Sequence, residues 1–205
     1  MNESHDTRAA LLKSAKRLLA ERGYRGTSIK AITSDAGANL GAVTYHFGTK
    51  EALYHEVLRS LLEPLAERMR TALDPETPAL VRIEALVRTY LSYMNENWEL
   101  PSLMLHELSL SGKLPQPIQE TVSAIMAMVS DLIREGQAAG EILAGNPLML
   151  TASTMAQPLF FLVMRRPLKE VAGIDMRERM TQQMVLEHLI SFVRRGLTID
   201  GSTNS

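Results

Sequence analysis

The sequence predicts an all-α protein, because apolar residues recur at helical spacing along most of its 205 residues and no alternating strand pattern bounded by hairpin turns interrupts them. Its composition, with 45% hydrophobic and 22% charged residues, is close to that of ordinary globular proteins. Cysteine is absent from the chain, which excludes disulfides, thiolate metal sites and thiol nucleophiles and fits a reducing compartment. We therefore expect about nine helices packed around apolar cores.

The positive charge of the chain is concentrated near its N-terminus. Residues 1–50 contain eight Lys or Arg residues against four Asp or Glu residues, a net charge of +4, whereas the rest of the chain has 14 basic and 19 acidic residues, a net charge of −5. A basic region of this kind attracts phosphates and is typical of nucleic-acid-binding proteins, but short basic stretches are also common on solvated helix faces. The charge alone leaves both interpretations open.

Two helices are expected before residue 37. The first covers residues 7–22 and has one apolar face, and Gly23 is suited to end it. The second is short and runs from Ser28 to about Ala36, with the hydroxyl of Thr27 as its N-terminal cap. Gly37 then supplies the left-handed residue of a tight turn.

A third helix is expected directly after this turn, from about Leu40 to Phe47. Its inward residues are Val43 and Phe47, and the residues expected to point largely away from the core are Ala42, Thr44, Tyr45 and His46. Two short helices joined by a tight turn form a helix-turn-helix, in which the second helix enters the major groove of DNA and the first braces it.

This region resembles TetR-type (TetR/AcrR) transcriptional regulators from about Thr7 to Tyr54. The matching stretches are Ala20-Glu21-Arg22-Gly23-Tyr24, Thr27-Ser28-Ile29, Ala36-Gly37-Ala38 and the run from Gly41 to Leu53. The resemblance implies a sequence-specific, homodimeric repressor of bacterial cytoplasm, associated with the nucleoid, that binds double-stranded DNA at a palindromic operator. Leu40 and Thr44 depart from residues that are frequent in the family, so the base specificity of a relative cannot be transferred.

The resemblance also implies two kinds of DNA contact. Phosphate contacts, which position the protein without reading sequence, are expected from Thr27, Tyr45, His46 and Lys50. Ser28 is also expected to bind DNA. Base contacts are expected from the start and outer side of the third helix, at Asn39, Leu40, Gly41, Ala42 and Thr44. Simpler roles remain open for three of these residues: Thr27 as a cap alone, Tyr45 as packing on the first helix, and Gly41 as a requirement of tight helix packing.

Further amphipathic helices are expected after residue 48. One begins near Thr49 and bends or ends at Pro64, because proline removes a main-chain hydrogen bond from a helix. A linker follows at 74–78, and the later helices are expected over residues 79–97, 101–110, 118–139, 147–165 and 175–195. We assign residues 1–53 to the DNA-binding domain and residues 54–205 to a helical effector-binding and dimerisation domain.

Residues 142–164 contain no charged side chain, which raises the question of a membrane span. Several polar residues and two prolines make the segment poorly suited to lipid, so we expect a helix buried at a subunit interface and no membrane partner. The family resemblance implies that the helices at 147–165 and 175–195 of both subunits form a four-helix dimer interface.

Sequence motifs of enzymes are lacking. The five histidines have no metal-binding spacing, and neither a Gly-rich phosphate loop nor a nucleophile elbow is present. His106 beside Glu107 is the strongest candidate for a general base, but such a pair is more often a surface or packing feature. We therefore expect no enzymatic activity, no cofactor and no metal.

Two functions remain open for the helices after residue 78. The first is an effector domain, in which a small apolar or amphipathic molecule releases the repressor from DNA. Its pocket is expected near the single tryptophan, with candidate residues Met94, Trp98, Met104, His106 and Phe160. The second is a purely structural dimerisation module, with DNA binding that is constitutive or regulated by another protein.

Overall fold

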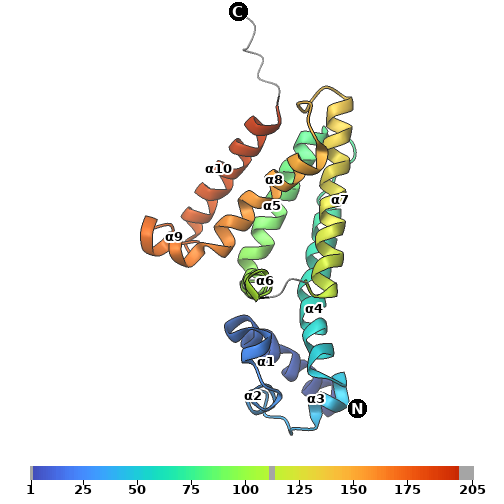
Figure 1. Cartoon of the computed structure of the whole chain (residues 1–205), viewed down its shortest axis with the longest axis vertical. Coiled ribbons are helices and arrows are strands. Elements are labelled where there is room, and N and C mark those ends of the chain that lie inside the picture. The colour runs from blue at the N-terminus through green and yellow to red at the C-terminus, as the bar shows by residue number, and fades with distance from the viewer. Residues whose placement is uncertain (1, 111–113, 199–205) are drawn as a thin grey trace, which may run out of the picture. The chain divides into compact units, whose positions relative to one another are not determined.

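The structure, a computed structural model, describes residues 2–110 and 114–198, and over these ranges it contains ten helices and no strand (Figure 1). The predicted all-α fold is confirmed. The chain forms two compact units, which we describe separately: the first comprises the described residues up to Pro64 together with Asn97–Glu120, and the second comprises Leu65–Glu96 and the described residues from Thr121 onward. The predicted domain boundary at residue 53 stays a prediction.

The first unit contains the helices around the N-terminus. They are α1 (Asn2–Gly26), α2 (Ile29–Asp35), α3 (Ala42–Phe47), the start of α4 (Lys50–Thr71), α6 (Glu99–Leu110) and the first residues of α7 (Gln116–Ala138). α1 contacts α2, α3 and α6. Its apolar face forms the core of the unit together with Ile32, Val43 and Leu53, all of which are fully buried.

α1 is interrupted where the sequence predicts its end. Gly23 has φ 70° and ψ 175°, a conformation outside the helical region that side chains with a Cβ rarely adopt. It also lies against α6, because a Cβ at this position would be 3.2 Å from Nδ1 of His106. The positive φ favours glycine here, and a Cβ would also require the His106 ring to shift by a few tenths of an ångström.

The second unit contains the rest of α4 and α7 together with α5 (Ala79–Glu96), α8 (Pro147–Val163), α9 (Arg165–Ala172) and α10 (Arg179–Leu197). α10 packs against α5 and α8. The buried carboxylate of Glu84 on α5 accepts two hydrogen bonds from the Arg194 guanidinium on α10, at 2.7 and 2.8 Å. This bidentate pair fixes the position of α10 on α5.

Two expectations about the helices need correction. Of the two outcomes expected at Pro64, an end of the helix is wrong, because α4 continues through the proline to Thr71. The proline is exposed and coincides with the border between the units. The helix expected over residues 147–165 ends at Val163, and a short amphipathic helix, α9, follows before Gly173 caps it in the left-handed conformation. α9 has only eight residues, too few for periodicity to separate it from a loop.

α8 is apolar but not buried all around. Its inner side is formed by Thr151, Thr154, Pro158 and Leu162, whereas Met149 and Phe160 are 58% and 50% exposed. Among the described residues no single helix is both long and apolar enough to span a membrane, and α8 and α9 pass that test only as a pair bent by 69°.

Candidate nucleic-acid interface

α2 and α3 are joined by a tight turn with the geometry of a helix-turn-helix. Ser28 caps α2, since its hydroxyl accepts a hydrogen bond from the amide of Ala31 at 3.1 Å. Gly37 has φ 64°, and the amide of Ala38 donates to the carbonyl of Thr33 at 2.9 Å, which closes the end of α2. The turn is therefore built as the sequence predicts, and it fixes the direction in which α3 leaves.

One face of α3 is anchored and the other is open to solvent. Val43 is fully buried and Ala42 is 6% exposed, so both hold the helix against the core. On the open side Tyr45 is 80% exposed and Leu40, just before the helix, is 62% exposed, and Asn39, Gly41 and Thr44 are exposed as well. An exposed leucine and tyrosine beside small residues can approach base edges and thymine methyl groups.

Ala42 does not belong to this open face. The sequence places it among the outward residues, but its methyl group packs into the core beside Val43. Ala42 directly precedes Val43 and lies only about 100° from it around the helix, so the buried face is wide enough to include both residues. We therefore remove Ala42 from the candidate base contacts.

Thr27 is also turned inward. It is 1% exposed, and its hydroxyl donates to the carbonyls of Gly23 and Leu18, at 2.9 and 3.1 Å. The cap of α2 is Ser28 and not Thr27, so the predicted cap is wrong by one residue. A hydroxyl committed to two carbonyls at the end of α1 is poorly placed to reach a phosphate, and its role here is to hold the α1–α2 connection.

Lys50 links the first residue of α4 to the end of α1. Its ammonium donates to the carbonyl of Tyr24 at 2.6 Å and lies 4.2 Å from the centroid of the Tyr24 ring. Partial burial lowers the pKa of Lys50 below its usual value. Two of the three ammonium donors remain after the bond to Tyr24, so the side chain can still contact a phosphate from a fixed position.

Three further polar residues of this region are His46, Thr49 and Lys30, of which the last two are not among the DNA contacts predicted from the sequence. His46 is half-buried, with its ring 4.8 Å from that of Tyr45 in an edge-to-face arrangement. Thr49 caps α4 by accepting a hydrogen bond from the amide of Ala52 at 3.0 Å, and Lys30 is exposed in the first turn of α2. The N-terminal capping pattern at Thr49 and the lysine next to Ser28 are signals that could have identified both.

The predicted effector residues do not gather in one unit. Trp98, Met104 and His106 lie in the first unit, and Met94 and Phe160 lie in the second. Met94 is buried in α5, Phe160 is half exposed on α8, and His106 packs on Gly23. Trp98 is 37% exposed and lines a cavity of about 580 Å³. The other described residues around that cavity are mostly charged or small: Ala10, Lys13, Ser14, Lys16, Arg17, Asp35, Ala36 and Glu99.

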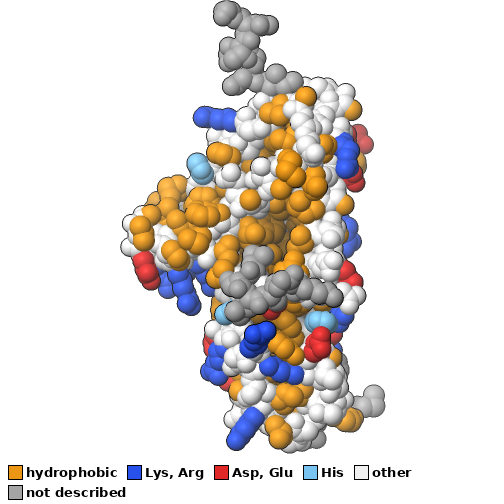
Figure 2. Space-filling view, viewed as in Figure 1, with side chains coloured by type: hydrophobic (Ala, Val, Ile, Leu, Met, Phe, Trp, Pro, Cys, Tyr) orange, Lys and Arg blue, Asp and Glu red, His pale blue; other side chains and the backbone are white. Residues whose placement is uncertain are grey.

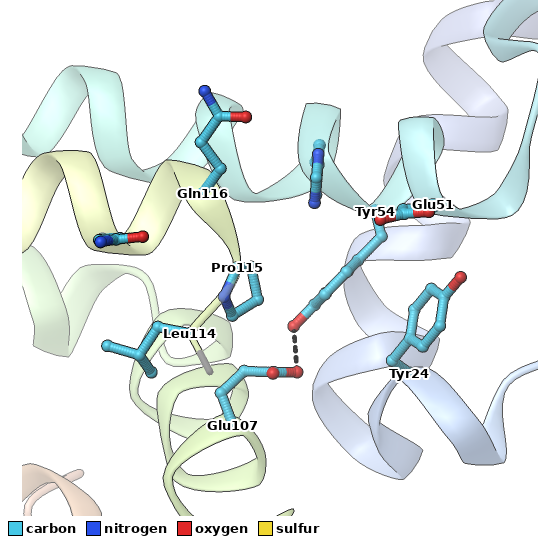
Figure 3. A pocket seen from close by; sticks show the side chains of 9 residues that line it. Tyr24, Glu51, Tyr54, Glu107, Leu114, Pro115 and Gln116 are labelled. Carbon is cyan, nitrogen blue, oxygen red and sulfur yellow. Dashed lines mark hydrogen bonds between the residues drawn. The ribbon is translucent and has the colours of Figure 1, made fainter. Parts of the chain in front are cut away.

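A second cavity of the first unit, about 630 Å³ in volume, lies where α1 ends, α4 begins and α6 is followed by α7 (Figure 3). Across it, the hydroxyl of the buried Tyr54 donates to the Glu107 carboxylate at 2.7 Å. Burial and this carboxylate raise the pKa of the Tyr54 phenol well above its usual value, so the hydroxyl keeps its proton. The rings of Tyr24 and Tyr54 lie 5.0 Å apart with an interplanar angle of 36°.

Comparison with known proteins agrees with this architecture. Residues 11–57 match the family described as "Bacterial regulatory proteins, tetR family", and residues 80–193 match "Tetracyclin repressor-like, C-terminal domain". The HTH-type transcriptional repressor KstR2 of Mycobacterium tuberculosis is 37% identical over 79 residues, which are 38% of this chain and 40% of the relative. The matched segment thus spans about two fifths of that curated relative.

Solved structures share the fold over nearly the whole chain. The ketosteroid transcriptional regulator KstR2 of Mycobacterium tuberculosis has a TM-score of 0.77 at 22% identity and covers 94% of this chain and 95% of its own. AibR, solved in complex with isovaleryl coenzyme A and operator DNA, has a TM-score of 0.75 at 17% identity and covers 91% of this chain and 97% of its own. The chain therefore belongs to the TetR family of bacterial regulatory proteins, which are DNA-binding transcriptional regulators and not enzymes.

Proposed function

We propose that this protein is a homodimeric repressor of the bacterial cytoplasm that binds a palindromic operator through α3 and is released from it by a small molecule. The single observation that carries the proposal is the two-sided α3: Ala42 and Val43 are held in the core while Leu40 and Tyr45 are 62% and 80% exposed on the other side. A rigid helix with an open face of this kind is what major-groove recognition requires.

The surface of the second unit supports a homodimer. α10 carries Met180, Met184 and Phe192 on one face, with the exposed His188 in the turn between Met184 and Phe192, and the three apolar residues are 83%, 55% and 49% exposed. On the adjacent α8, the exposed residues Met149, Ala152, Ala156 and Phe160 form another stripe, whose two alanines permit close approach. Figure 2 shows hydrophobic side chains gathered over the α8–α9 part of this unit. Apolar faces on two adjacent helices fit a second copy of the chain.

A ligand-responsive mechanism is supported by the path of α4. This helix begins two residues after Gly48, the C-terminal cap of α3, belongs to the first unit up to Pro64 and continues into the second. A ligand that moves α4 would change the separation of the two recognition helices in a dimer, which must match half-sites about 34 Å apart. AibR, which shares the fold, was solved in complex with isovaleryl coenzyme A and operator DNA, so a protein of this fold binds both a small molecule and DNA.

The test is selection of DNA from a random pool with the purified full chain, followed by titration of the selected operator with candidate small molecules. We expect a palindromic site and release of DNA by at least one ligand. The alternative is a constitutive DNA-binding dimer whose second unit is structural, and DNA binding that no ligand alters would favour it. Selection that recovers no common sequence would contradict the proposal altogether.

A further inference from the structure

Arg8, near the start of α1, joins three helices of the first unit through one guanidinium. Its Nη2 donates to the Glu56 carboxylate in the second turn of α4 at 2.5 Å. Its Cζ also lies 5.1 Å from the centroid of the Phe47 ring, and Phe47 is the last residue of α3. A guanidinium at this distance from a ring centroid makes a cation–π contact. Arg8 therefore connects the end of α3 to both α1 and α4.

A series of three aromatic rings leads from Arg8 to the open face of α3. The Phe47 and His46 ring centroids lie 6.2 Å apart with an interplanar angle of 60°, and the His46 and Tyr45 centroids lie 4.8 Å apart at 82°. Both pairs have the edge-to-face geometry that aromatic rings favour. Phe47 and His46 are half-buried, whereas Tyr45 is 80% exposed. The ring contacts thus connect Arg8 to an exposed phenol.

α3 depends on its neighbours for a fixed position, because a helix of six residues is too short to be stable by itself. Its beginning is held by the buried side chains of Ala42 and Val43. At its end the amide of Gly48 donates to the carbonyl of Thr44 at 3.0 Å, but Phe47 is only half-buried there. The guanidinium on the Phe47 ring supplies a further contact at this end of the helix.

The ion pair of Arg8 and Glu56 is better explained by orientation than by stability or by attraction of DNA. The two side chains are 41% and 34% exposed, and partly exposed pairs of this kind contribute little to folding stability. A carboxylate beside the arginine also weakens the attraction of the arginine for phosphate. What the carboxylate supplies is a fixed place for the guanidinium, against the Phe47 ring.

We propose that Arg8 is a positioning residue for DNA recognition, which is held by Glu56, packs on Phe47 and thereby orients His46 and Tyr45 toward the DNA backbone without contacting DNA itself. The inference rests on the proposed function, because it takes α3 as the recognition helix. A side chain that is already oriented loses less rotamer freedom on binding, so fixing the rings raises the affinity without adding a contact.

The experiment measures binding of the full-length protein to the DNA duplex selected from the random pool, and the NMR signals of the Tyr45 and His46 rings without DNA. Glu56→Ala is the decisive variant, because it releases Arg8 and also removes a negative charge from the DNA-binding unit. Electrostatics alone predicts equal or tighter binding. Loss of positioning predicts about fivefold weaker binding, with shifted ring signals and a nearly unchanged Tm. The control is Glu63→Ala, an exposed glutamate two turns further along α4, which should bind at least as tightly as the parent and keep its ring signals.

A second measurement tests whether Arg8 acts through Tyr45. The double variant Arg8→Gln/Glu56→Gln leaves the net charge unchanged, and it is compared in the parent and in Tyr45→Ala. We expect a loss of about fivefold in the parent but of less than about twofold in Tyr45→Ala, because coupled residues have non-additive effects. The slope of log affinity against log salt should stay that of the parent, because no phosphate contact is lost.

Three outcomes would overturn the inference: Glu56→Ala that binds like Glu63→Ala, equal losses of the double variant in the two backgrounds, or a salt slope lowered by about one per subunit, which would make Arg8 a phosphate ligand. Failure of the parent to select a common DNA sequence would instead contradict the proposed function. The ring signals of Tyr45 and His46 would then still decide the inference, since unchanged signals in Glu56→Ala would show that Arg8 does not hold these rings.

Discussion

The ammonium of Lys50 and the main-chain carbonyl of Tyr24 form a hydrogen bond of 2.6 Å that ties the first residue of α4 to the end of α1. The two residues are 26 positions apart in the chain, and the helix-turn-helix lies between them. This bond closes a loop around α2 and α3, so the orientation of the recognition helix depends on a side chain that follows it. The same lysine is a candidate phosphate contact.

Lys50→Ala should therefore affect both stability and DNA binding. Loss of a charged donor to a partly buried carbonyl should lower the free energy of unfolding by about 1–2 kcal/mol. Loss of a phosphate contact should also lower the slope of log affinity against log salt by about one per subunit. The control is Lys30→Ala, an exposed lysine of α2, for which we expect the change in salt slope without loss of stability. Thermal unfolding and affinity titrations at several salt concentrations measure the two effects, and an unchanged stability of Lys50→Ala would contradict the structural role.

Thr27→Val should destabilise the first unit without changing the salt dependence of DNA binding. The substitution removes a buried hydroxyl that donates to the Leu18 and Gly23 carbonyls, at an expected cost of about 1–3 kcal/mol. Thr27→Ser keeps the hydroxyl and should recover much of that loss. If Thr27→Val unfolded like the parent but lost a salt-dependent contact, Thr27 would be a phosphate ligand after all.

Leu40→Ala and Thr44→Ala should change which bases the protein prefers. Both side chains are exposed on the open face of α3, where each good base contact is worth roughly 1–3 kcal/mol of discrimination. The measurement is affinity for the selected operator and a panel of its single-base variants, at constant salt. Ala42→Gly is the comparison: because Ala42 is buried, we expect lower stability and an unaltered order of preferences. A uniform loss of affinity across all operators in both exposed variants would show that they do not read bases.

Phe160→Glu should convert the proposed dimer to monomers that remain folded. The side chain is 50% exposed on α8 in the single chain, so a carboxylate there is solvated in the monomer but would be buried without a partner in the dimer. Sedimentation at micromolar concentration gives the oligomeric state, and circular dichroism gives the helical content. Val81→Glu, at an exposed valine of α5, should leave the dimer intact. A Phe160→Glu protein that sediments as the parent does would place the interface elsewhere.

Arg194→Ala should cost more stability than the double variant Glu84→Gln/Arg194→Ala. Glu84 is only 6% exposed, and removal of Arg194 leaves its carboxylate buried without the cation that compensates its charge. In the double variant the neutral amide of the glutamine at position 84 has no charge to compensate. Arg194 itself is largely exposed and solvent screens the pair, so we expect only a moderate difference in the free energy of unfolding. Denaturant unfolding of the parent and the variants tests this, and a double variant less stable than Arg194→Ala would contradict it.

The sequence alone determined where most helices lie and predicted which region contacts DNA. The apolar periodicity of α1, the turn at Gly37 and the linker at residues 74–78 depend on neighbours within a few positions, which a linear pattern contains. The same local information revealed the family. The sequence pattern did not predict α9, because a helix of eight residues is too short to give a periodic signal.

Only the tertiary structure decided what each polar side chain contacts. Thr27 pairs with a carbonyl nine residues away, Lys50 with one 26 residues away and Tyr54 with a carboxylate 53 residues away. These partners depend on how α1, α4 and α6 pack against one another. Packing is set by the apolar side chains, and their pattern in the sequence does not indicate which polar groups will come into contact. In the folded chain Thr27 and Ala42 are buried, whereas Leu40 and Tyr45 are exposed to solvent. Glu51 and Glu107 line the same cavity. Only the tertiary structure decides these positions, because the burial of a side chain follows from the packing of whole helices.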